Sequence, residues 1–255
     1  MDRLAFTSLK SVHEERIRRE MLTNELANIN SVGFKRSFDL AAKAIKGQGP
    51  GFDSRLMPAL DPSEQVNLEP GTRMATARML DVAMDGATVM GVRAPNGDLA
   101  FTRRGDLRVN PQGVLENGQG FAILGEDARP INIPAGFDID VLRDGELFAR
   151  DPNTPDREGV RVGRIMLRDA SDRVMGRRQD GLFKPFGKGV RPNGDFQSGP
   201  QVASLTAGVL EGSNVSPIEA MVRMLDQTRS FETQVRIVKE ARSLDESGSS
   251  MMRAR

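Results

Sequence analysis

The chain contains no cysteine, no tryptophan and no tyrosine, and it has a single histidine among 255 residues. Without cysteine it has no disulfides, no thiolate metal sites and no cysteine nucleophile. With His13 as the one imidazole, only an all-oxygen site for a hard cation remains, and no calcium-binding loop of the EF-hand type occurs. We therefore expect no metal and no cofactor, and stability must come from packing or assembly.

The chain also lacks a surplus of charge. Thirty-six Lys and Arg balance thirty-five Asp and Glu, so the net charge of +1 provides no field to hold nucleic acid or an anionic membrane. Phenylalanine is the only aromatic type, and acids accompany each pair or group of basic residues, which are Arg103, Arg104, Arg161, Arg177 and Arg178. We expect no nucleic-acid partner.

Long apolar runs are missing as well. No stretch approaches the ~20 apolar residues of a membrane span, so we expect no direct membrane insertion. The N-terminus interleaves acids and bases and has no apolar run of the kind found in a cleaved secretory signal. The protein either stays in the cytoplasm or leaves by a route that does not use that signal.

Catalytic patterns are not found. His13 lies beside two glutamates without a serine-plus-acid arrangement, which favours a surface or seam histidine. The stretch GKGVRPNGDF at 187–196 lacks the order of a phosphate-binding P-loop and is better explained as a turn. We assign no catalytic, cofactor-binding or metal-binding residue and expect no small-molecule substrate.

Both ends of the chain have helical periodicity. Apolar residues recur mostly at three- to five-residue steps within the first thirty residues, and at three- and four-residue steps after a capping box formed by Ser216, Pro217 and Glu219. The narrow C-terminal stripe resembles the seam of a coiled coil. We therefore predict two long terminal helices paired as a coiled-coil-like stalk. The expected assembly interface consists of Leu9, Val12, Met21, Leu22, Leu26, Ile29, Ile218, Val222, Leu225, Val235 and Val238.

Between the helices the pattern changes. Gly and Pro predict an extended connector from about residue 40 to 72, and short apolar runs between Met79 and about Phe196 are cut by Asn-Gly and Asp-Gly pairs typical of β-hairpins. The predicted fold class is α+β, with an inserted, mainly antiparallel β domain. The predicted domains are 1–36 helix and turn, 37–78 connector, 79–200 β domain, and 201–255 C-terminal connector and helix.

The stretch NELANINSVGFKR, at 24–36, predicts the end of the first helix. Asn28 and Asn30 can bond locally to the backbone, and Gly33 can adopt the positive φ that turns the chain. Phe34 is then placed to fold back as an apolar anchor. We predict a structural turn at these four residues.

Three ordered segments resemble the bacterial flagellar rod and hook proteins. NELANINSVGFKRS at 24–37 is similar to the N-terminal signature of that family, and LEGSNVSPIEAMVRMLDQTRSFE at 210–232 is similar to its C-terminal signature. The stretch LDVAMDGATVMGVRAPNGDLAFTRRGDLRVNPQGVLENGQGFAILG at 80–125 resembles the family's β domain. The length and the opening MDRLAFTSL look most like the proximal rod members.

This resemblance implies a structural subunit of the flagellar basal-body rod, the drive shaft that transmits torque from motor to hook. Its implied partners are other proximal and distal rod subunits in a helical tube, and the type III export apparatus during secretion. The implied location is the rod, in the periplasmic space, reached without a cleaved signal peptide. The alternatives are a distal rod subunit and, from another class, a non-flagellar β-domain binding module whose helices only dimerise it.

Overall fold

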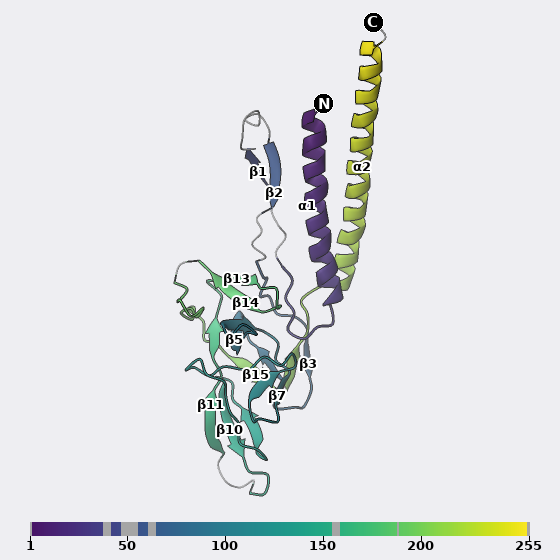
Figure 1. Cartoon of the computed structure of the whole chain (residues 1–255). Helices are drawn as coiled ribbons and strands as arrows, with labels where there is room; N and C mark the ends of the chain where they lie inside the picture. The colour runs from purple at the N-terminus through teal and green to yellow at the C-terminus, as the bar shows by residue number, and fades with distance from the viewer. Residues whose placement is uncertain are drawn as a thin grey trace. The chain divides into compact units, whose positions relative to one another are not determined.

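The computed structural model describes residues 2–37, 42–46, 56–60, 65–154, 159–187 and 189–253. The chain divides into two compact units (Figure 1). Unit 1 comprises residues 1–27, 39–63 and 216–255, and unit 2 comprises residues 28–38 and 64–215. Unit 1 is therefore assembled from three separate stretches of sequence.

Unit 1 contains the helices α1 (Asp2–Ala27) and α2 (Pro217–Arg253), and an antiparallel hairpin of β1 (Ala42–Lys46) and β2 (Leu56–Leu60). α1 contacts both α2 and β2. α2 begins as its capping box predicts, because the Ser216 hydroxyl oxygen accepts a hydrogen bond from the Glu219 amide at 3.4 Å.

The predicted coiled-coil-like stalk is wrong. In a coiled coil the apolar stripe is buried in the helix pair, yet Ile218, Val222 and Leu225 are 77%, 52% and 62% exposed. α2 instead meets α1 through a more polar face. Ser230 of α2 donates to Glu15 of α1 at 3.3 Å, and Arg19 of α1 lies 5.1 Å from the ring centroid of Phe231 on α2.

Two further side chains on α2 explain why this contact is not a coiled-coil seam. The Oε1 atoms of Gln227 and Gln234 are buried without a hydrogen-bond partner. Burying an unpaired amide oxygen costs free energy and does not contribute the apolar packing that holds a coiled coil together. The helices lie side by side (Figure 1), but the apolar stripe of α2 is on a face that α1 leaves open.

Unit 2 consists of short strands that all pair antiparallel within its sheets. A five-stranded sheet has the order β12-β5-β6-β14-β13, and a three-stranded sheet has the order β11-β10-β9. Three two-stranded ribbons are formed by β15-β4, β16-β3 and β7-β8. The strands are β3 (Arg73–Ala75), β4 (Val82–Met84), β5 (Thr88–Arg93), β6 (Leu99–Thr102), β7 (Leu107–Val109), β8 (Leu115–Asn117), β9 (Asp138–Val141), β10 (Glu146–Arg150), β11 (Val160–Arg164), β12 (Leu167–Asp169), β13 (Val174–Arg177), β14 (Phe183–Phe186), β15 (Leu205–Ala207) and β16 (Val209–Glu211).

The five-stranded sheet separates two apolar clusters. On β5, Met90 and Val92 belong to the larger cluster while Val89 belongs to the smaller one, as expected when successive side chains point to opposite faces. On β6, Ala100 and Phe101 divide in the same way. This burial on both faces explains why the β5 sequence is a continuous apolar run rather than an alternating one.

Candidate functional site: a buried charge cluster

Three charged side chains meet in the interior of unit 2, and each is fully buried. The Lys35 Nζ donates to Glu211 Oε1 at 2.7 Å. The Arg103 Nε donates to Glu211 Oε2 at 2.9 Å, and its NH2 donates to Oε1 at 3.0 Å. The Glu211 carboxylate therefore binds two residues, and the cluster joins three distant parts of the sequence.

Local structure fixes each member of the cluster. Lys35 follows the turn within the first signature segment, Arg103 comes directly after β6, and Glu211 ends β16. The Gly33 amide donates to the Glu211 carbonyl at 2.7 Å, which ties the turn to β16. Gly33 has φ +67°, and a Cβ at this position would lie 2.4 Å from the Arg103 carbonyl oxygen. Only glycine fits there without strain.

The cluster holds two cations and one anion, and backbone carbonyls accept further hydrogen bonds from both cations. Arg103 donates to the carbonyls of Gly86, Met84 and Thr88 at 2.6, 2.9 and 3.0 Å, and Lys35 donates to that of Glu69 at 2.9 Å. These contacts compensate most of the desolvation of the two cations.

The electrostatics reflect this surplus of positive charge. Burial lowers the pKa of Lys35 from 10.5 to about 8, and the nearby Arg103 adds to that effect, while Glu211 opposes it. Burial also lowers the pKa of Arg103, against the attraction of Glu211. At the edge of the cluster, burial opposes the ionisation of Asp85, but hydrogen bonds from Ser204 and Arg73 outweigh it and lower the Asp85 pKa.

A rim of further contacts surrounds the cluster. Asn214 accepts from the Arg36 amide at 2.7 Å and donates to the carbonyls of Asn67 and Glu69 at 3.0 and 3.1 Å. The Arg177 guanidinium lies 4.4 Å from the ring centroid of Phe34. The two signature segments, 24–37 and 210–232, are thus joined inside unit 2 through residues 33–36 and 211–214.

The predicted turn residues lie next to this cluster. The Asn28 carbonyl accepts from the Ser31 amide at 3.1 Å, and the Asn28 Oδ1 accepts from the Ser31 hydroxyl at 3.0 Å. Asn30 is exposed, Phe34 is half-buried, and Gly33 makes the close approach described above. His13 is exposed on α1.

The residues predicted to form the assembly interface differ in their exposure to solvent. Leu22 is buried, and Val12, Met21, Leu26, Ile29 and Val235 are half-buried. Ile218, Val222, Leu225 and Val238 are exposed. Leu9 lies outside the residues whose side chains are described.

Sequence reasoning missed Lys35, Arg103, Glu211 and Asn214. Lys35, Glu211 and Asn214 stand within the two signature segments, so the signal was present, but their pairing across 176 residues for Lys35 and Glu211 is invisible to local spacing. Arg103 was considered only as one of several basic residues. Its 0% exposure distinguishes it from a surface arginine.

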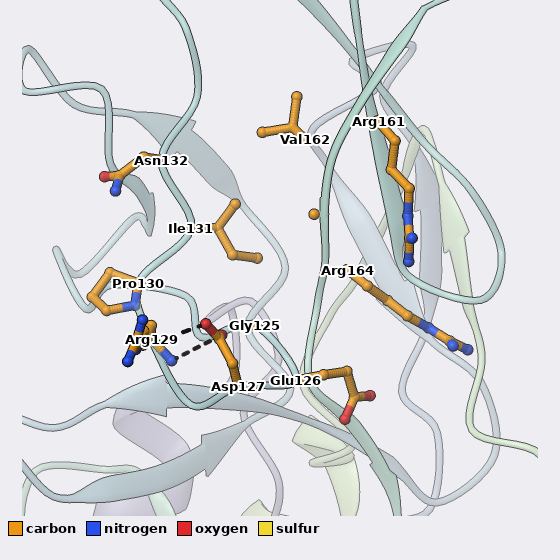
Figure 2. Close-up of a pocket in the computed structure, with 11 residues that line it drawn as sticks. Gly125, Glu126, Asp127, Arg129, Pro130, Ile131, Asn132, Arg161, Val162 and Arg164 are labelled. Atoms are coloured by element: carbon orange, nitrogen blue, oxygen red, sulfur yellow. Dashed lines mark hydrogen bonds and ion pairs between the residues drawn. The ribbon is translucent and has the colours of Figure 1, made fainter.

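An open groove of about 660 Å³ lies between residues 125–132 and β11 in unit 2 (Figure 2). Three arginines line it, and each has an acidic neighbour: Arg161 with Glu146 at 2.8 Å, Arg164 with Asp144 at 3.7 Å, and Arg129 with Asp127 at 4.0 Å. The groove therefore offers no surplus of charge that would select an ionic ligand.

Within the part of the chain that the structure describes, three or more histidine, cysteine or acidic side chains never group closely enough to hold a metal ion. Among the same residues, neither helix is long and apolar enough to cross a membrane.

Comparison with known proteins identifies the family. Residues 206–251 match the family model described as flagellar basal body rod FlgEFG protein C-terminal, and residues 83–149 match flagellar hook protein FlgE/F/G D1 domain. The chain is 32% identical over 239 residues to the flagellar basal-body rod protein FlgF of Salmonella typhimurium and 30% identical to FlgF of Escherichia coli, with 93% of each chain covered. It is 28% identical over 243 residues to FlgG of Buchnera aphidicola, covering 89% of this chain and 91% of the relative.

The two family models match separate parts of the structure. The first covers β16 and most of α2, and the second begins in β4 and extends to β10. Relatives named as rod proteins confirm the prediction of a structural protein rather than an enzyme. The chain therefore belongs to the flagellar rod and hook protein family, in which it is most like FlgF, and it is a structural subunit of the flagellar basal-body rod.

Proposed function

We propose that the chain is a proximal rod subunit whose neighbours in the helical tube, both proximal and distal rod subunits, pack against the apolar stripe of α2. This stripe is defined by Ile218, Met221, Val222 and Leu225. The observation that carries the proposal is its exposure, since these residues are between 52% and 77% exposed on one helix.

The arrangement of the stripe supports an interface. Single exposed apolar residues are normal, but a contiguous apolar patch on a surface marks a site of interaction. The four residues stand at positions i, i+3, i+4 and i+7, which places them on one face of α2. The names of the relatives identify them as rod proteins, so other rod subunits are the partners that this face fits.

α1 contributes to the same proposed interface. Val12, Met21 and Leu26 are half-buried in the isolated chain and so retain apolar surface for a neighbour, whereas Leu22 is buried. The proposed interface thus combines partly covered residues of α1 with fully open residues of α2. An apolar interface of this kind resembles those of permanent assemblies.

Unit 2 supplies stiffness in this proposal. Torque transmission requires a body that does not deform, and a buried ion cluster with its hydrogen bonds satisfied is rigid. The rod that this subunit helps to build transmits torque from the motor to the hook.

The proposal includes the route of the protein to the rod. The relatives named as basal-body rod proteins support a route that delivers the protein to the flagellum. We assign export through the flagellar type III apparatus, without signal cleavage, and a final location in the periplasmic part of the basal body.

Complementation of a strain lacking this subunit tests the proposed interface. Val222→Asp or Leu225→Asp buries a charge in the interface and is expected to abolish motility and stop rod growth, while unit 2 remains folded by circular dichroism. Val160→Asp is the matched control, because Val160 is a 69% exposed apolar residue of unit 2. Normal motility with both α2 variants, or equal loss with the control, would refute the interface.

Imaging of basal bodies that carry a tagged subunit tests the position. We expect the tag at the motor end of the rod. A tag at the hook end would replace the proximal assignment with the distal one. A protein absent from purified basal bodies would contradict both and favour a separate binding module.

A further inference from the structure

We infer that residues 205–214, defined here as the closing segment, gate the folding of unit 2, so that the preceding part of the unit has no stable native structure until this segment arrives. The inference concerns folding and goes beyond the proposed position and interface. It rests on the strand pairing, on the buried charges and on the core contacts of one segment.

The closing segment completes two of the ribbons of unit 2. β15 pairs with β4, with Leu205 opposite Met84, and β16 pairs with β3, with Glu211 opposite Arg73. More than 120 residues separate the partners along the chain. Such long-range pairings form late, because the entropy of closing the loop must be paid before the contacts stabilise it.

The same segment supplies part of the core. Leu205 and its partner Met84 are both fully buried members of the larger apolar cluster. Without β15 and β16, the strands β4 and β3 lose the partners of their two-stranded ribbons. A single unpaired strand is not stable by itself in water.

The buried charges make the folding of unit 2 depend more strongly on the closing segment. Closing β5 against β6 brings the Arg103 guanidinium to the carbonyls of Gly86 and Thr88. Before Glu211 arrives, the carboxylate that pairs with both Lys35 and Arg103 is missing. The positive charge of Arg73 repels both cations, whereas Asp85 attracts Arg103. Asp85 also forms an ion pair with Arg73 at 2.8 Å. Burying two cations without their carboxylate is strongly unfavourable.

The backbone of the closing segment holds the N-terminal turn as well. The Glu211 carbonyl accepts from the Gly33 amide, and the Asn214 amide donates to the Phe34 carbonyl at 3.3 Å. The turn, the ribbons and the charge cluster therefore become native together. In a chain exported N-terminus first, unit 2 would stay unfolded until the closing segment, which directly precedes α2, has been exported. This order is compatible with the export proposed above.

Pulsed hydrogen exchange during refolding of the full chain tests this inference. Protein diluted from urea is labelled at increasing times, and protection is followed by mass spectrometry in peptides that cover β5–β6 and β15–β16. We expect both regions to become protected at the same rate, within twofold. Protection of β5–β6 at a rate tenfold or more above that of β15–β16 would overturn the inference.

Two full-length variants separate gating from general stability. Glu211→Gln is expected to slow protection of both regions together by at least tenfold, because the missing carboxylate acts before folding is complete. Asp127→Asn, which removes the charge of the 65% exposed partner of Arg129, is expected to leave both rates unchanged within twofold.

An unchanged β5–β6 rate in Glu211→Gln, with only faster unfolding, would show that the cluster forms after the folding barrier and would contradict the gate. Should Glu211→Gln fail to reach the native state, the order of protection in the unmodified chain decides by itself.

Discussion

Unit 2 and α2 of unit 1 use charged and apolar side chains in opposite ways. In unit 2, Lys35, Arg103 and Glu211 are buried and bonded to one another and to carbonyls. On α2, Val222 and Leu225 face solvent, and the buried Oε1 atom of Gln227 lacks a hydrogen-bond partner. The charges of this cluster find their partners within unit 2, whereas the exposed apolar stripe of α2 gains stability when a neighbour covers it.

The largest expected effect breaks the charge cluster. Glu211→Ala leaves Lys35 and Arg103 buried without their carboxylate, which should lower the free energy of unfolding of unit 2 by about 3 to 5 kcal/mol. Urea denaturation followed by circular dichroism measures this loss. The same measurement on Asp127→Ala, which removes the 65% exposed partner of Arg129, should give a loss of less than about 1 kcal/mol. Equal losses would mean that the buried cluster is no more important than a surface pair.

The second prediction concerns the backbone that positions the cluster. Gly33→Ala forces a methyl group against the Arg103 carbonyl and a side chain into positive φ, for an expected loss of about 2 to 4 kcal/mol. Gly97→Ala is the matched control, since Gly97 has φ +86° but no atom within 4 Å of the added Cβ. The control should lose only about 1 kcal/mol. A similar loss in both variants would mean that strain, rather than the close approach, determines the effect at Gly33.

The third prediction uses the pKa of Lys35. Because the folded-state pKa is about 8 and the unfolded value is 10.5, the unfolded chain binds more protons between these pH values. Stability attributable to Lys35 should therefore rise with pH in this window, by at most about 1.4 kcal/mol per pH unit. Below pH 8 the group is charged in both states, and above 10.5 it is neutral in both.

Comparison with Lys35→Met isolates this effect. The chain has no cysteine and no tyrosine, so few other side chains titrate in the same window. Urea denaturation of both proteins at pH 7.5 to 10.5 should show the unmodified chain gaining stability relative to the variant. Parallel pH profiles would show that burial does not lower the Lys35 pKa.

The sequence predicted part of this architecture. The capping box and the apolar spacing located α2, and Asn-Gly and Asp-Gly pairs indicated an antiparallel middle, where Gly97 and Gly145 indeed have positive φ. The prediction of a paired stalk was wrong because the spacing of apolar residues reveals an apolar stripe on a helix but not which surface covers that stripe. The polar side chains through which α2 meets α1, such as Gln227 and Ser230, follow no pattern that distinguishes them from solvent-facing residues.

The charge cluster was predicted least well. Its members lie 108 to 176 residues from Glu211 in sequence, and each alone resembles an ordinary surface charge. The quoted signature segments contained Lys35 and Glu211 without indicating that they meet. Only the fold, which brings β16 beside the turn at Gly33, reveals that these two charges are buried together.

The smallest expected effect sharpens the comparison between the units with one substitution at two leucines. Leu225→Ala removes side-chain atoms that are already in water, so the stability of the isolated chain should change by less than about 0.5 kcal/mol. Leu205→Ala removes fully buried atoms of unit 2 and should cost about 2 to 5 kcal/mol. Thermal and urea denaturation of the purified variants give both values. A large loss from Leu225→Ala would mean that the α2 stripe is already covered within the isolated chain and is not open to a neighbouring subunit.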